Sequence, residues 1–454
     1  MTESAPKTAS RSKLGDLPEW DLNDLYPGPE SAELKADIER LRAEAGAFRE
    51  RFAGTLAGLD GAALGAAIAD YERIEEALGR IASYAGLLYA GDMTDPQRAK
   101  FQQAVRETGT AISSDLLFFT LELNRIEPPA LRDKLADPAL ARYEPWLRDL
   151  RAYRPHQLAD ELERLLHEKQ VTGRAAWTRL FDETLAGLRF TLDGETLGST
   201  EVLDKLLEPD RALRERAGRA FAEGLAGQRR LFALITNTLA KDKRIEDEWR
   251  GFARPVSSRN LANFVEDEVV DALVGAVRES YPKLSHRYYA LKARWLGLDK
   301  LAFWDRNAPL PGGAEAPVPW AEAQRIVLGA YASFSPELAS IGARFFANRW
   351  IDAPVRPGKA PGAFSHPTVP SAHPYILVNY QGRTRDVMTL AHELGHGVHQ
   401  VLAGPQGHLM ADTPLTLAET ASVFGEMLTF QALLRGTDDP ARRAIIRIGL
   451  VEIS

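Results

Sequence analysis

Two histidines and a glutamate stand at a spacing that is typical of a zinc site in hydrolytic enzymes. His392, Glu393 and His396 form the motif H-E-x-x-H in a segment that is predicted to be helical. Histidines at positions i and i+4 project from one face of a helix, so both imidazoles can bind the same ion. Glu393 lies about 100° around the helix from His392, where it can accept a proton from a nearby water. The alternative, a solvated helix turn that carries the motif by chance, is disfavoured by the flanking sequence.

A hydrolytic zinc site needs a third protein ligand and an open fourth position. We predict that the next helix begins at Thr413 and Pro414, with Thr as N-cap and Pro at the first helical position. Glu419 follows among small apolar residues, so we expect a buried carboxylate that faces a cation. Two antiparallel helices joined by a short loop bring Glu419 opposite His392 and His396. The prediction is a His₂Glu site of the gluzincin type that holds one Zn²⁺ per chain.

Three further residues are candidates for supporting the ligands. Glu426 shares a helix face with Glu419 and is predicted to hold a ligand histidine, the alternative being an ordinary surface glutamate. His399 returns to the face of His392, and we expect it to support the site or to pack at the helix end, because a fourth ligand would close the open position. Asp386 is either a first-turn anion against the helix dipole or a carboxylate that supports a ligand imidazole.

A strand-like run at residues 374–380 precedes the motif helix, and a turn at Gln381 and Gly382 separates them. We predict that residues 375–379 form an edge strand beside the site, able to pair with an extended peptide backbone. The candidate substrate contacts are Tyr375, Leu377, Asn379 and Gly362. Flexible turns around them are expected at Gly358, Gly362 and Gly382.

The chain is predicted to comprise three parts. Residues 1–16 are polar and expected to be disordered, residues 17–197 form a helical N-terminal region, and residues 198–454 form the catalytic domain. The N-terminal region carries an apolar stripe at 64–81 and ends in a hairpin whose turn is Asp193-Gly194. Arginines between 210 and 234 are expected to form a solvated helix face.

Composition fits a globular protein, with 45% hydrophobic and 26% charged residues over 454 positions. A net charge of −7 gives no basis for nucleic-acid binding. Without cysteine, neither a thiolate nucleophile nor a Cys-ligated zinc is possible. No apolar leader or membrane-spanning segment is evident, so we expect a cytoplasmic protein with no membrane partner.

Several segments resemble the M3 family of zinc metallopeptidases, in particular its oligoendopeptidase F type. The likeness is strongest in DVMTLAHELGHGVH at 386–399 and LAETASVFGE at 417–426. Further similar segments are WDLNDLYP at 20–27, YRPH at 153–156 with Glu168-Lys169 and Ala176-Trp177, SHRYY at 285–289, WDRNAP at 304–309, 359–364 and 374–382. The resemblance extends from about residue 18 to about residue 430. It implies a mainly α-helical gluzincin with a small β-sheet next to the zinc site, which hydrolyses short peptides.

The resemblance is weakest at the C-terminal end. Members of the family usually continue well beyond the third ligand, and the tail at 445–454 does not resemble them. We therefore expect that the C-terminal part of the catalytic domain is missing and that activity is reduced. Two alternatives to an oligopeptide-cleaving endopeptidase follow. One is a truncated fragment that binds zinc but is catalytically impaired, and the other is an M3-type peptidyl-dipeptidase. The oligomeric state does not follow from the sequence.

Overall fold

The computed structural model describes residues 13–311, 316–440, 443 and 446, and most of them are helical. The mainly α-helical fold with small sheets is thereby confirmed. The helices are α2 (Ala32–Phe52), α3 (Gly61–Gly91), α4 (Pro96–Arg125), α5 (Pro128–Lys134), α6 (Pro138–Ala141), α7 (Glu144–Arg151), α8 (Asp160–Lys169), α9 (Arg174–Gly187), α10 (Ser199–Asp204), α11 (Arg211–Gly227), α12 (Arg229–Arg250), α13 (Ser257–Leu261), α14 (Asp267–Ser280), α15 (Ser285–Trp295), α16 (Trp320–Phe334), α17 (Pro336–Ala347), α18 (Thr384–Ala403) and α19 (Leu415–Arg435). The strands are β1 (Phe190–Leu192), β2 (Glu195–Leu197), β3 (Ile351–Asp352), β4 (Phe364–His366) and β5 (Tyr375–Leu377).

The first long helices begin at side chains that cap them. Ser31 accepts a hydrogen bond from the backbone of α2, and Asp60 and Asp95 do the same for α3 and α4. Pro96 occupies the first turn of α4, where its missing N–H costs nothing. The predicted apolar stripe on α3 is confirmed, because its members Leu64, Ile68, Ile74 and Ile81 are buried in the main core. That core is continuous from α2 to α18 and joins the N-terminal helices to the small sheet.

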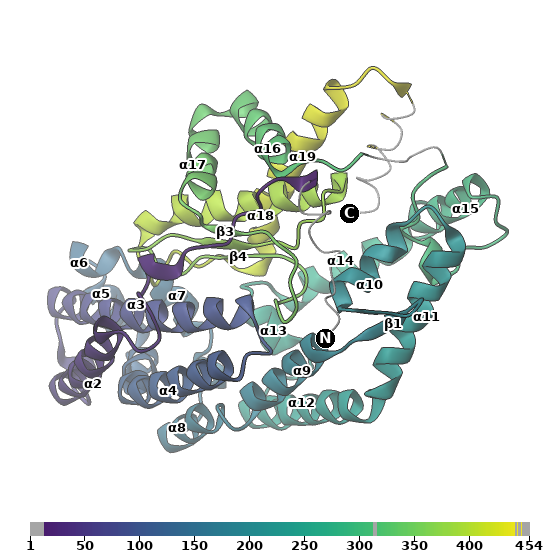
Figure 1. Ribbon diagram of the computed structural model, residues 1–454. Coiled ribbons are helices and arrows are strands. Elements are labelled where there is room, and N and C mark those ends of the chain that lie inside the picture. Colours follow the sequence, from purple (N-terminus) through teal and green to yellow (C-terminus); the bar gives the residue numbers. More distant parts are fainter. Residues whose placement is uncertain (1–12, 312–315, 441–442, 444–445, 447–454) are drawn as a thin grey trace.

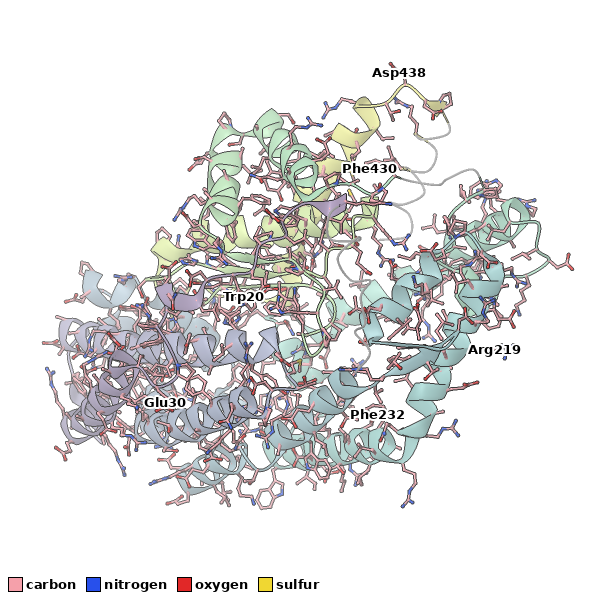
Figure 2. The ribbon with its side chains drawn as sticks, in the orientation of Figure 1. Trp20, Glu30, Arg219, Phe232, Phe430 and Asp438 are labelled. Carbon is pink, nitrogen blue, oxygen red and sulfur yellow. The ribbon has the colours of Figure 1, made fainter. Side chains whose placement is uncertain are left out.

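Figure 1 shows α2 to α8 on one side of the molecule, α10 to α15 on the other, and α16 to α19 above both. The small sheet lies between α18 and α3. His366 of β4 bonds to Ser83 of α3 through a 2.9 Å contact between Nε2 and Oγ. The N-terminal segment packs on the same sheet, where the Trp20 ring lies 6.0 Å from that of Tyr375 (Figure 2). Two segments from the N-terminal part of the chain therefore hold the sheet.

The hairpin predicted near residue 190 is present, with β1 and β2 antiparallel. Its turn residues Asp193 and Gly194 both have positive φ, as a tight hairpin turn requires. Phe190 packs with Val202 of α10 and Ala217 of α11 in a small separate core. The hairpin thus contacts the helices that follow it, while the domain boundaries placed at 17, 198 and 454 remain predictions.

The three-stranded sheet has the order β3–β5–β4, with β3 parallel and β4 antiparallel to β5. The prediction that residues 375–379 form an edge strand is therefore wrong. Ile376 pairs with Ile351 on one side and with Ser365 on the other. An unbroken apolar run is typical of a strand that is buried on both faces, and β5 is such a strand. Within the part of the chain that the structure describes, β3 and β4 are the two edge strands, and Pro18 and Asp21 make backbone hydrogen bonds to residues on either side of β3.

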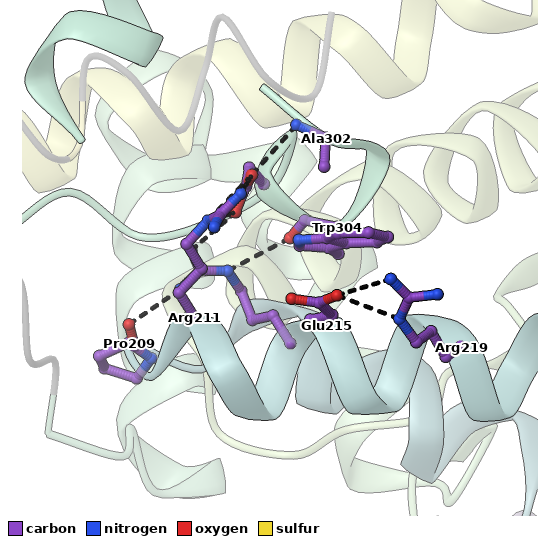
Figure 3. A network of polar contacts seen from close by, with 8 residues as sticks. Pro209, Arg211, Glu215, Arg219, Ala302 and Trp304 are labelled. Atoms are coloured by element: carbon purple, nitrogen blue, oxygen red, sulfur yellow. Dashed lines mark hydrogen bonds and ion pairs between the residues drawn. The ribbon is translucent and has the colours of Figure 1, made fainter. Parts of the chain in front are cut away.

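The arginines of α11 are only partly solvated, contrary to the prediction. Arg214 is 2% exposed, and its guanidinium lies 3.0 Å from a carboxylate oxygen of Asp305, which is fully buried. Arg211 contacts the second oxygen of Asp305 at 2.9 Å, whereas Arg219 pairs with Glu215 along the helix surface and lies over the Trp304 ring (Figure 3). Helical spacing indicates which residues share a face, but it does not reveal a carboxylate contributed from about 90 residues away.

Two remaining expectations concern the terminus and the membrane. The N-terminal segment predicted to be disordered is residues 1–16, and residues 1–12 lie outside the described residues. Leu14, within the described part of that segment, is buried. No helix in the described ranges combines the length and the apolar character needed to cross a membrane.

Candidate active site

The helix that carries the H-E-x-x-H motif is anchored at its first turn by Asp386. One oxygen of the Asp386 carboxylate accepts hydrogen bonds from the backbone N–H groups of Gln381 and Arg383, each at 2.9 Å. The side chain therefore caps α18, and its carboxylate is bonded to backbone at the turn before the helix. The hypothesis that Asp386 supports a ligand imidazole is corrected, because its hydrogen bonds hold the helix start instead.

Two glycines let α18 and α19 approach closely. A Cβ at Gly395 would lie 2.6 Å from the backbone oxygen of Ala421, and one at Gly425 would lie 2.1 Å from the hydroxyl of Tyr331. Tyr331, on α16, donates a 2.6 Å hydrogen bond to the carbonyl of Ala391, one residue before the motif. Farther along the same interface Phe430 of α19 clusters with Met388 of α18 (Figure 2). These contacts are not among those predicted from the sequence, although the glycine inside H-E-L-G-H is their visible signal.

This crossing places Glu419 opposite the two histidines. Its Oε2 atom lies 3.2 Å from Nε2 of His392 and 3.5 Å from Nε2 of His396. The three ligand atoms all lie within 4.8 Å of one another, and these residues form a group able to hold a metal ion. The two imidazole rings stand almost perpendicular, at 81°, with centroids 5.0 Å apart. The structure thus brings together the three residues predicted as ligands.

Glu426 lies behind His392, on the side away from Glu419. Its Oε2 atom is 3.3 Å from Nδ1 of His392, and the residue is only 5% exposed. This contact raises the pKa of His392, whereas burial lowers the pKa of His396. With Nδ1 engaged by a carboxylate, Nε2 of His392 is the nitrogen that is left for an ion.

Glu393 is 7% exposed and lies beside the cluster. Burial raises its pKa to about 7, and the nearby charge of Glu419 acts in the same direction. His392 and a hydrogen bond from the backbone N–H of Ser365, in β4, lower it. A carboxyl group whose pKa lies near neutrality can both accept and donate a proton at working pH.

The environment of Glu419 differs from the prediction in two respects. First, its side chain is 58% exposed, so the expectation of a buried carboxylate is wrong. Second, α19 begins at Leu415 with Pro414 as N-cap, so Thr413 does not cap the helix. Ser422 donates a 2.6 Å hydrogen bond to Oε2 of Glu419 and thereby fixes an otherwise open side chain.

Other candidates lie less favourably. His399 is half-buried and has no hydrogen bond among the residues described, although its charge lowers the pKa of His396. Tyr375 and Leu377 are fully buried in the central strand, so they are corrected as substrate contacts. Asn379 uses its side-chain amide to hold the carbonyl oxygens of Ala360 and Gly362. Its role is to fix a loop beside β4. The three predicted turn glycines, Gly358, Gly362 and Gly382, all have positive φ.

Comparisons with known proteins agree with this geometry. A family model described as Oligopeptidase F matches residues 122–190, and one described as Peptidase family M3 matches residues 336–450. Two segments of the chain, one of which contains all three proposed ligands, thus match peptidase family M3. The second match runs through the ligand residues and on to residue 450, so the predicted lack of resemblance in the tail is wrong up to that point. With this match over its cluster of metal-ligating residues, the chain is a metallopeptidase.

Two curated relatives cover nearly the whole chain. Oligopeptidase PepF of Bacillus subtilis is 26% identical over 465 residues, which span 99% of this chain and 68% of that protein. Group B oligopeptidase PepB of Streptococcus agalactiae is 26% identical over 448 residues, 96% of this chain and 73% of that protein. Together with several relatives named oligoendopeptidase F, they confirm the predicted type within the M3 family.

Solved structures support the same fold. Oligoendopeptidase-F from Enterococcus faecium superimposes with a TM-score of 0.66 at 22% identity, over 92% of this chain and 70% of that one. PZ peptidase A, solved with an inhibitor, gives a TM-score of 0.74 at 16% identity, over 95% of this chain and 75% of that one. At these identities the likeness concerns the fold alone.

Proposed function

We propose that the chain is a zinc-dependent endopeptidase that cleaves short peptides. His392, His396 and Glu419 hold one Zn²⁺ ion, and Glu393 is the general base. The observation that carries the proposal is the convergence of three ligand atoms within 4.8 Å, with the buried Glu393 adjacent. Short peptides are proposed because the relatives with matching sequence are named oligopeptidases.

The donor set fits zinc. Two ligands bound to one tetrahedral zinc ion, each at about 2.0–2.1 Å, lie about 3.3 Å apart. The separations of 3.2 Å and 3.5 Å between Glu419 and the two histidines agree with that spacing. Two imidazoles and one carboxylate leave a tetrahedral ion with an open position, as hydrolysis requires. The exposure of Glu419 is consistent with access to that position from solvent.

When bound, zinc supplies Lewis acidity, which lowers the pKa of water and polarises a carbonyl group. The residues of the chain supply the proton transfers. Glu393 accepts a proton from the attacking water and later donates it to the amine that leaves. Its burial keeps the pKa near neutrality, so both transfers are feasible at working pH. Glu426 holds His392 in one orientation throughout.

The outer edge of β4, where Gln400 donates a hydrogen bond to the Ser365 carbonyl, replaces the predicted edge at 375–379 as the place where an extended peptide pairs. Residues Phe364–His366 pair with β5 on one side only within the described residues. The backbone N–H of Ser365 points to Glu393, so this strand runs directly beside the proposed base. Pairing through the main chain tolerates many peptide sequences. A cytoplasmic location is proposed together with this activity.

Hydrolysis of an internally quenched fluorescent peptide tests the function. We expect cleavage of a peptide with both termini blocked, loss of cleavage with a chelator, and recovery with one equivalent of Zn²⁺. A peptidyl-dipeptidase would require a free carboxyl terminus and would leave the blocked peptide intact. A catalytically impaired zinc-binding fragment would bind the metal stoichiometrically and cleave neither peptide. Either outcome would replace the proposal.

A further inference from the structure

A cavity of about 250 Å³ lies in the N-terminal region, outside the candidate active site. It is formed by the end of α3, the first half of α4, Gln170 and residues 174–182 of α9 (Figure 1). Its polar lining includes Tyr89, Arg106, Arg174, Thr178, Arg179 and Asp182. Three guanidinium groups in one cavity need compensating negative charge, whether from the protein or from a ligand.

Tyr89 has a hydroxyl group without a partner. The residue is 6% exposed, and its hydroxyl oxygen is buried with no hydrogen bond to any of the residues described. Burial raises the pKa of this phenol, and Glu183 and Asp182 also raise it, while Arg179 and Arg106 lower it. The phenol therefore stays protonated and is a buried donor in need of an acceptor. Leaving such a donor unpaired costs free energy.

The charges around the cavity do not cancel within the protein. Arg179 is occupied by Gln103 and Glu183, at 2.6 Å and 3.6 Å. Arg174 is exposed and makes no ion pair with any described residue. Among the described residues, the guanidinium of Arg106 hydrogen-bonds only to the Ala175 carbonyl, at 3.5 Å, and its charge also lowers the pKa of Asp182. Asp182 is the one carboxylate in the lining, and burial raises its pKa. The lining thus has more positive than negative groups.

We propose that this cavity binds a small oxyanion, either a free phosphate or the carboxylate of a peptide. Tyr89 donates a hydrogen bond to the anion, and Arg106 and Arg174 form charge-assisted contacts with it. The lining matches this chemistry, because a guanidinium offers several fixed donors and the phenol offers one more. Asp182 faces the same space and disfavours dianions relative to monoanions.

The test is calorimetric titration of inorganic phosphate into the full chain at constant ionic strength, with a chelator present to remove metal. One site is expected, with affinity reduced about tenfold or more in Arg174→Gln and in Tyr89→Phe, since each removes a contact to a charged group. Arg132→Gln is the matched control, because Arg132 is an exposed arginine on α5 that does not line the cavity. It should bind as the wild type does.

A second titration distinguishes the two sources of the anion. An N-acetylated dipeptide with a free carboxylate is compared with its C-terminal amide, in the wild type and in Arg174→Gln. If the wild type binds the free-carboxylate dipeptide more tightly than its amide, and Arg174→Gln does not, the anion is a peptide carboxylate. If the wild type binds phosphate but neither dipeptide, the anion is free phosphate. Binding of neither anion, or equal affinity in all variants, would overturn the proposal. Tyr89→Phe should unfold at no lower temperature than the wild type without ligand, so a loss of binding there cannot be attributed to misfolding.

Discussion

Glu426 and His392 lie in contact across the interface of α19 and α18, with Oε2 of Glu426 3.3 Å from Nδ1 of His392. The second oxygen of the carboxylate is buried and has no partner among the described residues. Among the described residues, the His392 imidazole is therefore the one hydrogen-bond partner of the Glu426 carboxylate. We propose that Glu426 fixes the tautomer and orientation of His392, one of the proposed metal ligands.

Replacing Glu426 with Gln should weaken zinc affinity by about 10–100-fold, the usual cost of losing a partner behind a ligand. Gln preserves the volume, so the helix interface should be retained. His399→Ala is the control, because His399 has no hydrogen bond to the cluster in the described structure; it was predicted from sequence to support the site. Competition with a chromogenic chelator measures both affinities. Similar zinc affinity in Glu426→Gln and the wild type would assign Glu426 a purely structural role.

Variants of the proposed zinc ligands and variants of the proposed base should differ in zinc content. His392→Ala and Glu419→Ala are expected to lose stoichiometric zinc, because each removes one of three protein ligands. Glu393→Gln should retain one zinc per chain and lose peptide hydrolysis, because the amide cannot accept the proton. Metal content by mass spectrometry, measured beside peptide cleavage, gives both results. Full zinc content in Glu419→Ala would show that the third ligand is a different residue.

Asp305→Ala should destabilise the protein by about 3–5 kcal/mol, because it leaves the buried Arg214 guanidinium without its carboxylate. The matched control is Arg216→Ala on the same helix. The pair of Arg216 with Asp193 is half exposed on both sides, so its loss should change stability little. Urea denaturation followed by circular dichroism compares the two variants. Equal midpoints would mean that water reaches Arg214 when Asp305 is removed.

Glu75 on α3 should make stability decrease between pH 4.5 and pH 7. Burial raises its pKa from 4.5 to about 7, so the folded state binds more protons than the unfolded state in this window. The contribution is present below pH 4.5 and is lost as the pH rises through 7, with an upper limit of about 3 kcal/mol. Glu75→Gln should therefore be more stable than the wild type at pH 8 and comparable at pH 4.5. Urea midpoints at both pH values provide the check, and a constant difference would contradict the assignment.

The sequence by itself determined the chemistry of the site and the local elements that carry it. The i and i+4 spacing of His392 and His396 placed both on one helix face, and a helix has only one geometry for that spacing. The hairpin turn at Asp193-Gly194 and the stripe on α3 followed in the same way, since both depend on residues close in the chain.

Only the tertiary structure decided which neighbours these elements have. An apolar run such as Tyr375–Leu377 suits a strand with one partner or with two, and the pairing of β3 and β4 on its two sides made it central. The buried state of Arg214 depends on Asp305, a residue of another element. The approach of Glu419 to the histidines depends on Gly395 and on the packing of α18 against α19. Local periodicity specifies which face a residue occupies, whereas burial, pairing and ligand convergence arise from contacts between segments far apart in the chain.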